Sequence, residues 1–347
     1  MSKSSLLEII KARIHKNGPL SIADYMEFCL GHPECGYYMT RDPFGAQGDF
    51  TTAPEISQLF GEIVGAWLVD QWMQLGSPEK FNLIELGPGR GTLMADILRT
   101  AGVMPGFLQA CQVHLVEMSP VLKSLQQQNL GTAPCPILWH KNIDNIPDEP
   151  TLIVANEFFD ALPIHQYVFQ NGAWHERVIL IENNQLTFST APTDQHYGPA
   201  TEGEIKETSP ATEAIFTNLL HIVHKQGGSC VFIDYGYDQD AFGDTLQALR
   251  KHQFSEVLST PGEQDLTAHV NFARLQELAV AADKGQAELV TQQQFLQQNG
   301  IDLRLNSLCR NKSAGICAKL RTGANRLLDP AQMGELFKVL TYSYLKV

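Results

Sequence analysis

Residues 81–100 of this chain read FNLIELGPGRGTLMADILRT. Residues 81–86 are a short, mainly apolar run that stops in a glycine-rich turn, and a helical pattern follows the turn directly. A short apolar run bounded by a turn is typical of a buried strand, and a helix after it indicates a parallel sheet. This stretch therefore predicts one strand–turn–helix unit of an α/β protein.

The same alternation continues through most of the chain. Apolar strands separated by helices are typical of a parallel sheet that is covered on both faces. Further strands are predicted over residues 112–118, 136–139, 151–156 and 229–236, with helices over 121–128 and 211–225. Later segments predict a helix over residues 272–285, a strand over 288–290, a helix over 291–300 and a last strand over 337–344.

The predicted domain organisation has two parts. Residues 1–75 predict a helical N-terminal cap, whose glycine-containing loop over residues 43–52 is suited to act as a lid. Residues 76–347 form the main domain, with insertions at about 164–210 and 237–270. The first insertion contains Asn-Gly between alternating segments, which predicts an inserted β-hairpin or meander.

The lid is followed by a predicted long helix. Thr52 and Glu55 have the spacing of a capping box, in which each side chain binds the backbone of the other residue. Apolar residues then recur at helical spacing until Gly76 and Pro78 end the pattern. We expect one continuous helix that packs this apolar face against the core.

Composition excludes several classes of protein. The chain has 25 Lys and Arg against 38 Asp and Glu, a net charge of −13, which disfavours binding to a nucleic-acid backbone. No apolar run reaches the ~20 residues that a membrane-spanning helix needs. The seven cysteines are scattered without a CxxC pair, which predicts a reducing compartment and no metal site. With no transit or signal segment apparent, we expect a bacterial cytoplasmic protein.

The spacing of the glycines narrows the range of possible functions. Gly87, Gly89 and Gly91 follow the strand as E-x-G-x-G-x-G. A dinucleotide fingerprint requires a glycine at position 92, where Thr92 stands, and a P-loop requires a lysine that is absent. The pattern is that of class I S-adenosylmethionine (SAM) methyltransferases. It predicts their Rossmann-like sheet, which is mostly parallel with an antiparallel last strand.

An acidic residue at the end of the next strand supports this interpretation. Glu117 closes that strand, where a carboxylate can accept hydrogen bonds from both hydroxyls of a ribose. The alternative to a cofactor site is that the glycines form an ordinary turn and that Glu117 is an exposed residue at the end of a strand. The predicted cofactor-binding residues are Glu85, Gly87, Pro88, Gly89, Gly91, Glu117, Met118, Asn156, Asp49, Phe50 and Thr51.

The segment ANEFFDALP, residues 155–163, is predicted to face the methyl acceptor. Glu157 and Asp160 are three residues apart and would share one side of a helical turn. Two carboxylates suit a guanidinium, which stays protonated and presents a rigid fork of donors. The alternative is that Glu157 caps the turn and Asp160 is a solvated surface acid. Asn156 and His269 complete the predicted catalytic set, although an isolated histidine such as His269 can equally be a hydrogen-bonding structural residue.

Several longer segments resemble one family, the MidA-like methyltransferases, over the chain from about residue 6 to the C-terminus. They are SIADYMEFCLGHPECGYY, GDFTTAPEISQLFGE, LIELGPGRGTLMADILR, VHLVEMSP, IVANEFFDALPIHQY, VFIDYG and PGEQDLTAHV. The family includes a mitochondrial enzyme that makes symmetric dimethylarginine on a core subunit of respiratory complex I. The resemblance implies a SAM-dependent enzyme with a protein substrate that carries a target arginine, and a complex I subunit is a candidate.

The resemblance also assigns roles along the chain. It implies that the glycines of the turn bind the cofactor, that Glu117 binds the ribose, that Asn156, Glu157 and Asp160 face the acceptor, and that residues 48–52 close over the cofactor. Three other hypotheses remain open: a SAM-binding assembly factor without essential catalysis, a small-molecule or nucleobase methyltransferase, and a dehydrogenase. The apolar faces and the inserted hairpin are compatible with a homodimer.

Overall fold

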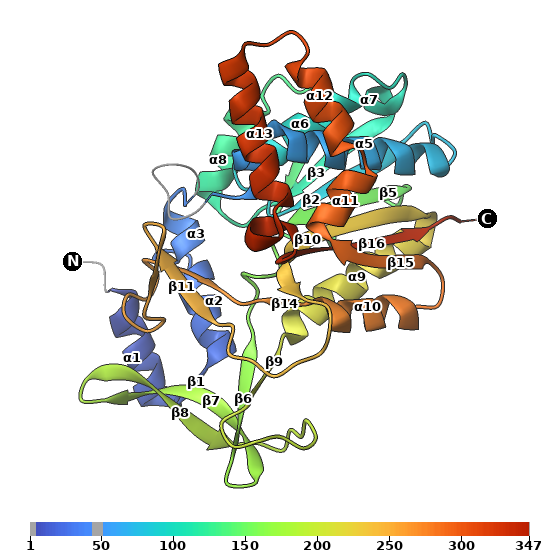
Figure 1. Ribbon diagram of the computed structural model, residues 1–347. Helices are drawn as coiled ribbons and strands as arrows, with labels where there is room; N and C mark the ends of the chain where they lie inside the picture. Colours follow the sequence, from blue (N-terminus) through green and yellow to red (C-terminus); the bar gives the residue numbers. More distant parts are fainter. Residues whose placement is uncertain (1–4, 44–50, 347) are drawn as a thin grey trace. The chain divides into compact units, whose positions relative to one another are not determined.

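The computed structural model describes residues 5–43 and 51–346, and the chain forms two compact units (Figure 1). The first unit is built from residues 1–50, 159–215 and 239–271, and the second from residues 51–158, 216–238 and 272–347. Each unit has an apolar core of its own. Residues 51–75, which we expected in the N-terminal cap, belong to the second unit because their long helix packs its apolar residues in the core of the main sheet.

The main sheet of the second unit confirms the predicted α/β fold. Its strands lie in the order β15-β16-β10-β5-β2-β3-β4, and β16 is antiparallel to both of its neighbours while the others run parallel. The strands are β2 (Phe81–Leu86), β3 (Cys111–Val116), β4 (Ile137–His140), β5 (Thr151–Asn156), β10 (Gly228–Tyr237), β15 (Gln286–Thr291) and β16 (Phe337–Tyr344).

The strand order reverses between β2 and β5. From β2 the chain continues outward to β3 and β4, whereas β5 leads in the opposite direction to β10. The two strands pair in parallel, with Leu86 opposite Ala155, so their carboxyl ends meet at the same edge. In open α/β sheets ligands bind at such a switch point. The glycine turn after β2 and the NEFF segment after β5 therefore lie on the ligand-binding edge.

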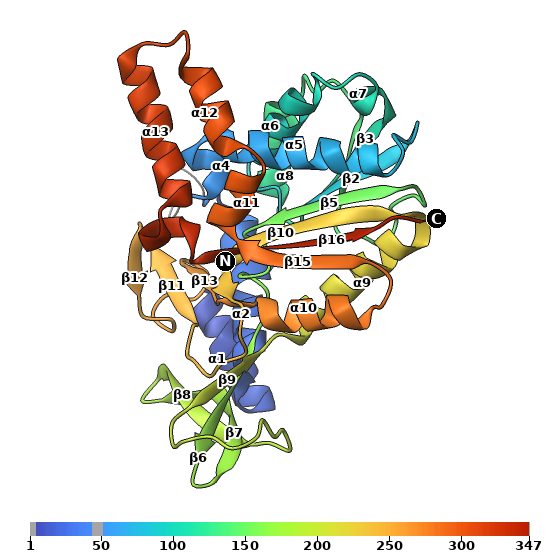
Figure 2. The same cartoon turned by 45° about the vertical axis from the view of Figure 1, so that its right-hand side comes forward.

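Helices cover both faces of this sheet, with α5 and α6 on one face and α9 and α10 on the other (Figure 2). Close packing of α5 against α6 depends on Gly61, where a Cβ atom would lie 2.5 Å from Asp96 Cβ. The helices are α4 (Ala53–Ile56), α5 (Gln58–Gln74), α6 (Thr92–Ala101), α7 (Phe107–Ala110), α8 (Pro120–Asn129), α9 (Pro210–Gln226), α10 (Phe272–Ala281), α11 (Gln292–Gln298), α12 (Ile301–Cys309) and α13 (Ala314–Leu328), followed by a π-helical turn (Pro330–Gly334).

A buried carboxylate joins three of these helices. Glu62 on α5 is 1% exposed and accepts hydrogen bonds from Arg99 on α6 at 2.5 Å and from Arg304 on α12 at 2.7 Å. Burial alone would raise the pKa of Glu62, but the hydrogen bonds from the two arginines lower it below the usual value. This network anchors α12, a helix that apolar periodicity did not predict.

The first unit combines short helices with two small antiparallel sheets. The larger sheet has the order β1-β7-β6-β9 with β8 also paired to β7, so the predicted hairpin is part of a five-stranded sheet. The smaller sheet has the order β12-β11-β13. The elements are α1 (Leu6–Asn17), β1 (Leu20–Ser21), α2 (Ile22–Gly31), α3 (Tyr37–Thr40), β6 (His165–Gln170), β7 (Ala173–Glu182), β8 (Gln185–Pro192), β9 (Ile205–Thr208), β11 (Gln247–Arg250), β12 (Gln253–Ser255), β13 (Asp265–Thr267) and β14 (Val270–Asn271).

The described residues contain neither a helix that could span a membrane nor a cluster of metal-ligating side chains. No helix in residues 5–43 and 51–346 is long and apolar enough to cross a membrane. Within the same ranges, no group of three or more His, Cys, Asp and Glu side chains is arranged to hold a metal ion.

Candidate functional site

The glycine turn after β2 has a backbone that only glycine adopts easily. Gly87, Gly89 and Gly91 have φ of 59°, 54° and 81°, all in the left-handed region. A Cβ atom at Gly87 would lie 2.9 Å from Phe158 Cδ2, so a side chain there would also collide with the segment after β5. Gly91 is the N-cap of α6, and the turn therefore places the start of that helix at the carboxyl end of the sheet.

Glu117 follows β3 and is held in place from two directions. Its Oε1 accepts a hydrogen bond from the backbone N–H of Ser119 at 2.7 Å, and its Oε2 accepts one from Gln126 Nε2 at 3.1 Å. The same Gln126 amide group donates to the carbonyl oxygen of Gly89 at 2.8 Å. Gln126 is fully buried and thus links the glycine turn to the carboxylate. Nothing in the sequence singled out this glutamine.

Burial raises the pKa of two carboxyl groups in this site. Burial raises the pKa of Glu117 to about 7, although hydrogen bonds from Ser119 and Gln126 oppose the shift. Burial, with the nearby charge of Glu117, raises the pKa of Glu85 to about 8. Two carboxyl groups whose pKa values lie this close to neutrality are typical of a functional site and favour a cationic ligand.

Two buried oxygen atoms at the sheet edge lack a donor within the described chain. They are Glu85 Oε2, one residue before the end of β2, and Asn156 Oδ1, at the end of β5. A buried acceptor without a hydrogen bond costs on the order of 1–3 kcal/mol, and charged groups cost more. A ligand that donates hydrogen bonds at the switch point would remove this cost for both atoms.

Glu157 occupies a strained position directly after β5. Its φ of 48° is left-handed, which for a residue other than glycine costs on the order of 1–3 kcal/mol. Its Oε1 accepts hydrogen bonds from the backbone N–H of Ala53 at 3.1 Å and from Asn156 Nδ2 at 3.2 Å. The predicted helical turn over residues 157–160 is absent because of this left-handed residue. The expectation that a helix places Glu157 and Asp160 on one side is therefore wrong.

Asp234, in the C-terminal half of β10, supports the same segment. Its Oδ2 accepts a hydrogen bond from the backbone N–H of Phe158 at 3.1 Å, and its Oδ1 accepts one from that of Tyr235 at 2.9 Å. The side chain is 1% exposed, so it acts inside the fold. A carboxylate bound to two amides fixes the path of the chain after β5.

The helix after the predicted lid differs from the expectation. Thr52 forms no side-chain cap, and Ser57, with extended backbone, divides the predicted helix into α4 and α5. Glu55 makes no capping box because its Oε1 accepts a hydrogen bond from Thr92 Oγ1 at 2.5 Å, and its Oε2 lies 3.9 Å from Arg90. The short helix α4 is thereby tied to the glycine turn.

Asp160 and His269 lie in the first unit. The carbonyl oxygen of Asp160 accepts a hydrogen bond from the N–H of Ala268 at 2.9 Å, next to His269. Burial lowers the pKa of His269, which favours the neutral imidazole. Tyr38, which the sequence did not single out, donates to Asp265 at 2.9 Å. The pKa of Tyr38 is raised by burial first and then by the charges of Asp265 and Asp160.

The remaining predicted residues fall into two groups. Asp49 and Phe50 lie outside the described residues. Thr51 is half-buried, Pro88 is buried, and Met118 is 61% exposed beside Glu117.

Comparison with known proteins identifies the family. A family model described as S-adenosyl-L-methionine-dependent methyltransferase matches residues 63–290. The mitochondrial protein named protein arginine methyltransferase NDUFAF7 homolog from Drosophila melanogaster is 36% identical over 97% of this chain and 84% of its own length. The mitochondrial protein arginine methyltransferase NDUFAF7 of Homo sapiens is 34% identical over 96% of this chain and 82% of its own length. This chain belongs to the family of S-adenosyl-L-methionine-dependent methyltransferases.

A solved structure agrees with this assignment. A Burkholderia thailandensis protein crystallised with S-adenosyl-homocysteine is 26% identical, with a TM-score of 0.87 over 99% of this chain and 92% of its own length. The predicted cytoplasmic location, in contrast, is wrong, because the curated relatives that match nearly the whole chain are mitochondrial. The prediction relied on the lack of a recognisable targeting segment in the sequence.

The residues at the switch point fit the cofactor of this family. S-adenosyl-L-methionine carries an ammonium group and two ribose hydroxyls, all of which are donors. The site offers acceptors for these donors, namely the orphaned oxygens of Glu85 and Asn156 and the carboxylate of Glu117. The glycine turn supplies the close backbone approach that a Cβ atom at Gly87 would prevent.

Proposed function

We propose that this methyltransferase acts on the guanidinium group of an arginine in a protein substrate. The observation that carries the proposal is the match of 97% of the chain, at 36% identity, to a protein named protein arginine methyltransferase. The acidic surface also supports it, because a net charge of −13 attracts a basic segment.

On the cofactor side, we propose roles for Gly87, Gly89, Gly91, Glu85 and Glu117. S-adenosyl-L-methionine, when bound there, supplies an electrophilic methyl group on a sulfonium. Glu117 accepts hydrogen bonds from the ribose, and Gln126 keeps its carboxylate oriented toward the glycine turn. Glu85 and Asn156 accept from the amino-acid portion, which satisfies their buried oxygens.

On the acceptor side, the proposal assigns binding of the arginine to Glu157. A guanidinium remains protonated at neutral pH, so a carboxylate can hold it by charge as well as by hydrogen bonds. The hydrogen bonds that Oε1 accepts from Ala53 and Asn156 hold this carboxylate at the carboxyl end of β5. The strained backbone of Glu157 fixes where this carboxylate lies. For Asp160 and His269, a role on the acceptor side remains a prediction.

The test combines methyl transfer to an arginine peptide with calorimetry of cofactor binding. Glu157→Gln keeps the size of the side chain and removes its charge, so we expect cofactor affinity within about twofold of wild type. Turnover should fall about 100-fold, the scale of losing one electrostatic contact to the reacting group. Glu79→Gln, which changes an exposed glutamate, is the matched control. Unimpaired turnover of Glu157→Gln would reject the assignment, and a peptide that no variant methylates would reject the arginine substrate.

Two finer statements complete the proposal. The resemblance to MidA-like methyltransferases supports a subunit of respiratory complex I as the protein substrate. Mass spectrometry of methylated arginines in those subunits, in cells with and without this gene, tests it, and an unchanged pattern argues against it. We also propose a homodimer, which sedimentation velocity distinguishes from a monomer.

A further inference from the structure

The helices α12 and α13 form an antiparallel hairpin that projects from the second unit beyond the helices covering the sheet (Figures 1 and 2). We call residues 301–328 the basic hairpin. It contains six Lys or Arg residues and one acidic residue, and the rest of the chain has 19 basic and 37 acidic residues. A strongly basic element thus stands on an otherwise acidic protein.

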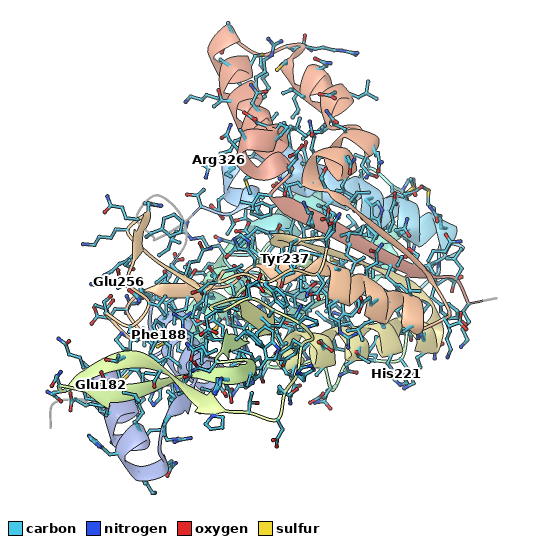
Figure 3. The ribbon with its side chains drawn as sticks, turned by 60° about the horizontal axis from the view of Figure 1, so that its bottom comes forward. Glu182, Phe188, His221, Tyr237, Glu256 and Arg326 are labelled. Atoms are coloured by element: carbon cyan, nitrogen blue, oxygen red, sulfur yellow. The ribbon has the colours of Figure 1, made fainter. Side chains whose placement is uncertain are left out.

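Most of these cations have no partner in the described chain. Arg304 is the exception, because it binds the buried Glu62. The other five are exposed, and none forms an ion pair with another described residue; they are Arg310, Lys312, Lys319, Arg321 and Arg326. Figure 3 labels Arg326 on α13, with long side chains extending from both helices of the hairpin.

Two of these cations lie in a row along α13. Lys319 and Arg326 are seven residues apart on α13, so they lie on one face about 10 Å from each other. The helix packs along the neighbouring side, since Gly323, Ala324 and Leu327 are buried. The apolar side of the helix is therefore used inside the fold, and its cationic side faces outward.

Exposed apolar residues accompany the cations. Leu303 on α12 is 78% exposed and Ile316 on α13 is 47% exposed. Mixed apolar and charged surfaces of this kind are typical of contacts between proteins, whereas a nucleic-acid contact would consist mainly of cations. An amphipathic helix that enters a membrane needs a long free apolar face, and the C-terminal part of that face of α13, with Ala324 and Leu327, is buried.

We infer that the basic hairpin is a docking surface for an acidic segment of the protein substrate, remote from the residue that is methylated. The identity of the partner, a protein substrate, rests on the proposed function. The acidic remainder of the enzyme attracts the basic segment around the target arginine, and the hairpin selects substrates that also carry an acidic segment.

A binding experiment tests the surface without requiring catalysis. The probes are a fluorescein-labelled peptide of Glu-Glu-Leu repeats, the same peptide with Gln in place of Glu, and phosphatidylcholine vesicles containing phosphatidylglycerol. The variant Lys319→Glu/Arg326→Glu reverses two exposed charges on the hairpin. The control Lys80→Glu/Lys284→Glu makes the same change in net charge at exposed lysines elsewhere in the second unit.

We expect wild type to prefer the Glu peptide and the hairpin variant to bind it about tenfold more weakly, because two exposed attractions become repulsions. The control should stay within about twofold. Equal weakening of both variants, equal binding of the two peptides, or a preference for vesicles overturns the inference. In a second arm, an arginine peptide with a Glu-Glu-Leu tail should have a lower KM than one with a Gln-Gln-Leu tail, for wild type only. If neither peptide is methylated, the proposed function fails while the binding arm still decides the docking surface.

Discussion

Glu85→Gln tests the electrostatics of the cofactor site through protein stability. The pKa of Glu85 rises from an ordinary 4.5 to about 8 in the folded protein. The difference of about 3.5 units, at about 1.4 kcal/mol each, corresponds to about 5 kcal/mol. The folded protein binds this proton more tightly than the unfolded chain does. The stabilisation is therefore fully present below pH 4.5 and is lost as the pH rises through about 8.

The assay is urea unfolding of wild type and Glu85→Gln at a series of pH values from 5 to 9. Gln has no proton to lose, so the variant should become more stable than wild type as the pH rises, by up to about 5 kcal/mol at the alkaline end. Glu79→Gln, at an exposed position, should follow the wild-type curve. If the difference between wild type and Glu85→Gln is the same at pH 5 and pH 9, Glu85 does not titrate as the buried site requires.

Two further predictions concern the second unit. Cofactor affinity should rise about tenfold between pH 6 and pH 8, because Glu117, with a pKa of about 7, accepts from both ribose hydroxyls only when it is ionised. Calorimetry measures this change, and a pH dependence that persists in Glu117→Gln would assign it to another group. Glu62→Ala should lower the free energy of unfolding by about 1.5–3 kcal/mol, because it removes the charged hydrogen bonds to Arg99 and Arg304, whose half-exposed side chains stay hydrated. Urea unfolding measures the loss, and a value below about 0.5 kcal/mol, as for an exposed pair, would contradict the prediction.

The sequence predicted the main sheet well because each buried strand is a short apolar run. The strand predicted over residues 151–156 is β5 (Thr151–Asn156), and the one over 337–344 is β16 (Phe337–Tyr344). The glycine spacing likewise predicted the turn after β2, where Gly87, Gly89 and Gly91 adopt left-handed backbone that most other residues avoid.

Backbone conformations that the amino-acid sequence does not mark could not be predicted. The apolar period runs through Ser57 unchanged, although the backbone there is extended and separates α4 from α5. The left-handed Glu157 has no such signal either, because glutamate rarely adopts this conformation. Both features arise from tertiary contacts, such as the hydrogen bonds that Thr92 Oγ1 donates to Glu55 and that the N–H of Ala53 donates to Glu157.

Side chains that support the site were missed for a similar reason. Gln126 belongs to a run of glutamines on α8, and only the fold shows that it alone reaches both Gly89 and Glu117. The helices α12 and α13 were also missed, because few of their residues are buried and their apolar period is correspondingly weak. Their charge excess was nevertheless present in the sequence.

A crystal structure of this enzyme with S-adenosyl-homocysteine is the most direct measurement. The ligand should lie over the turn formed by Gly87, Gly89 and Gly91, with the Glu117 carboxylate about 2.6–3.0 Å from its ribose hydroxyls. Glu85 Oε2 and Asn156 Oδ1 should each gain a donor. A ligand bound elsewhere, or a Glu117 side chain directed away from the ribose, would contradict the assignment of the switch point as the cofactor site.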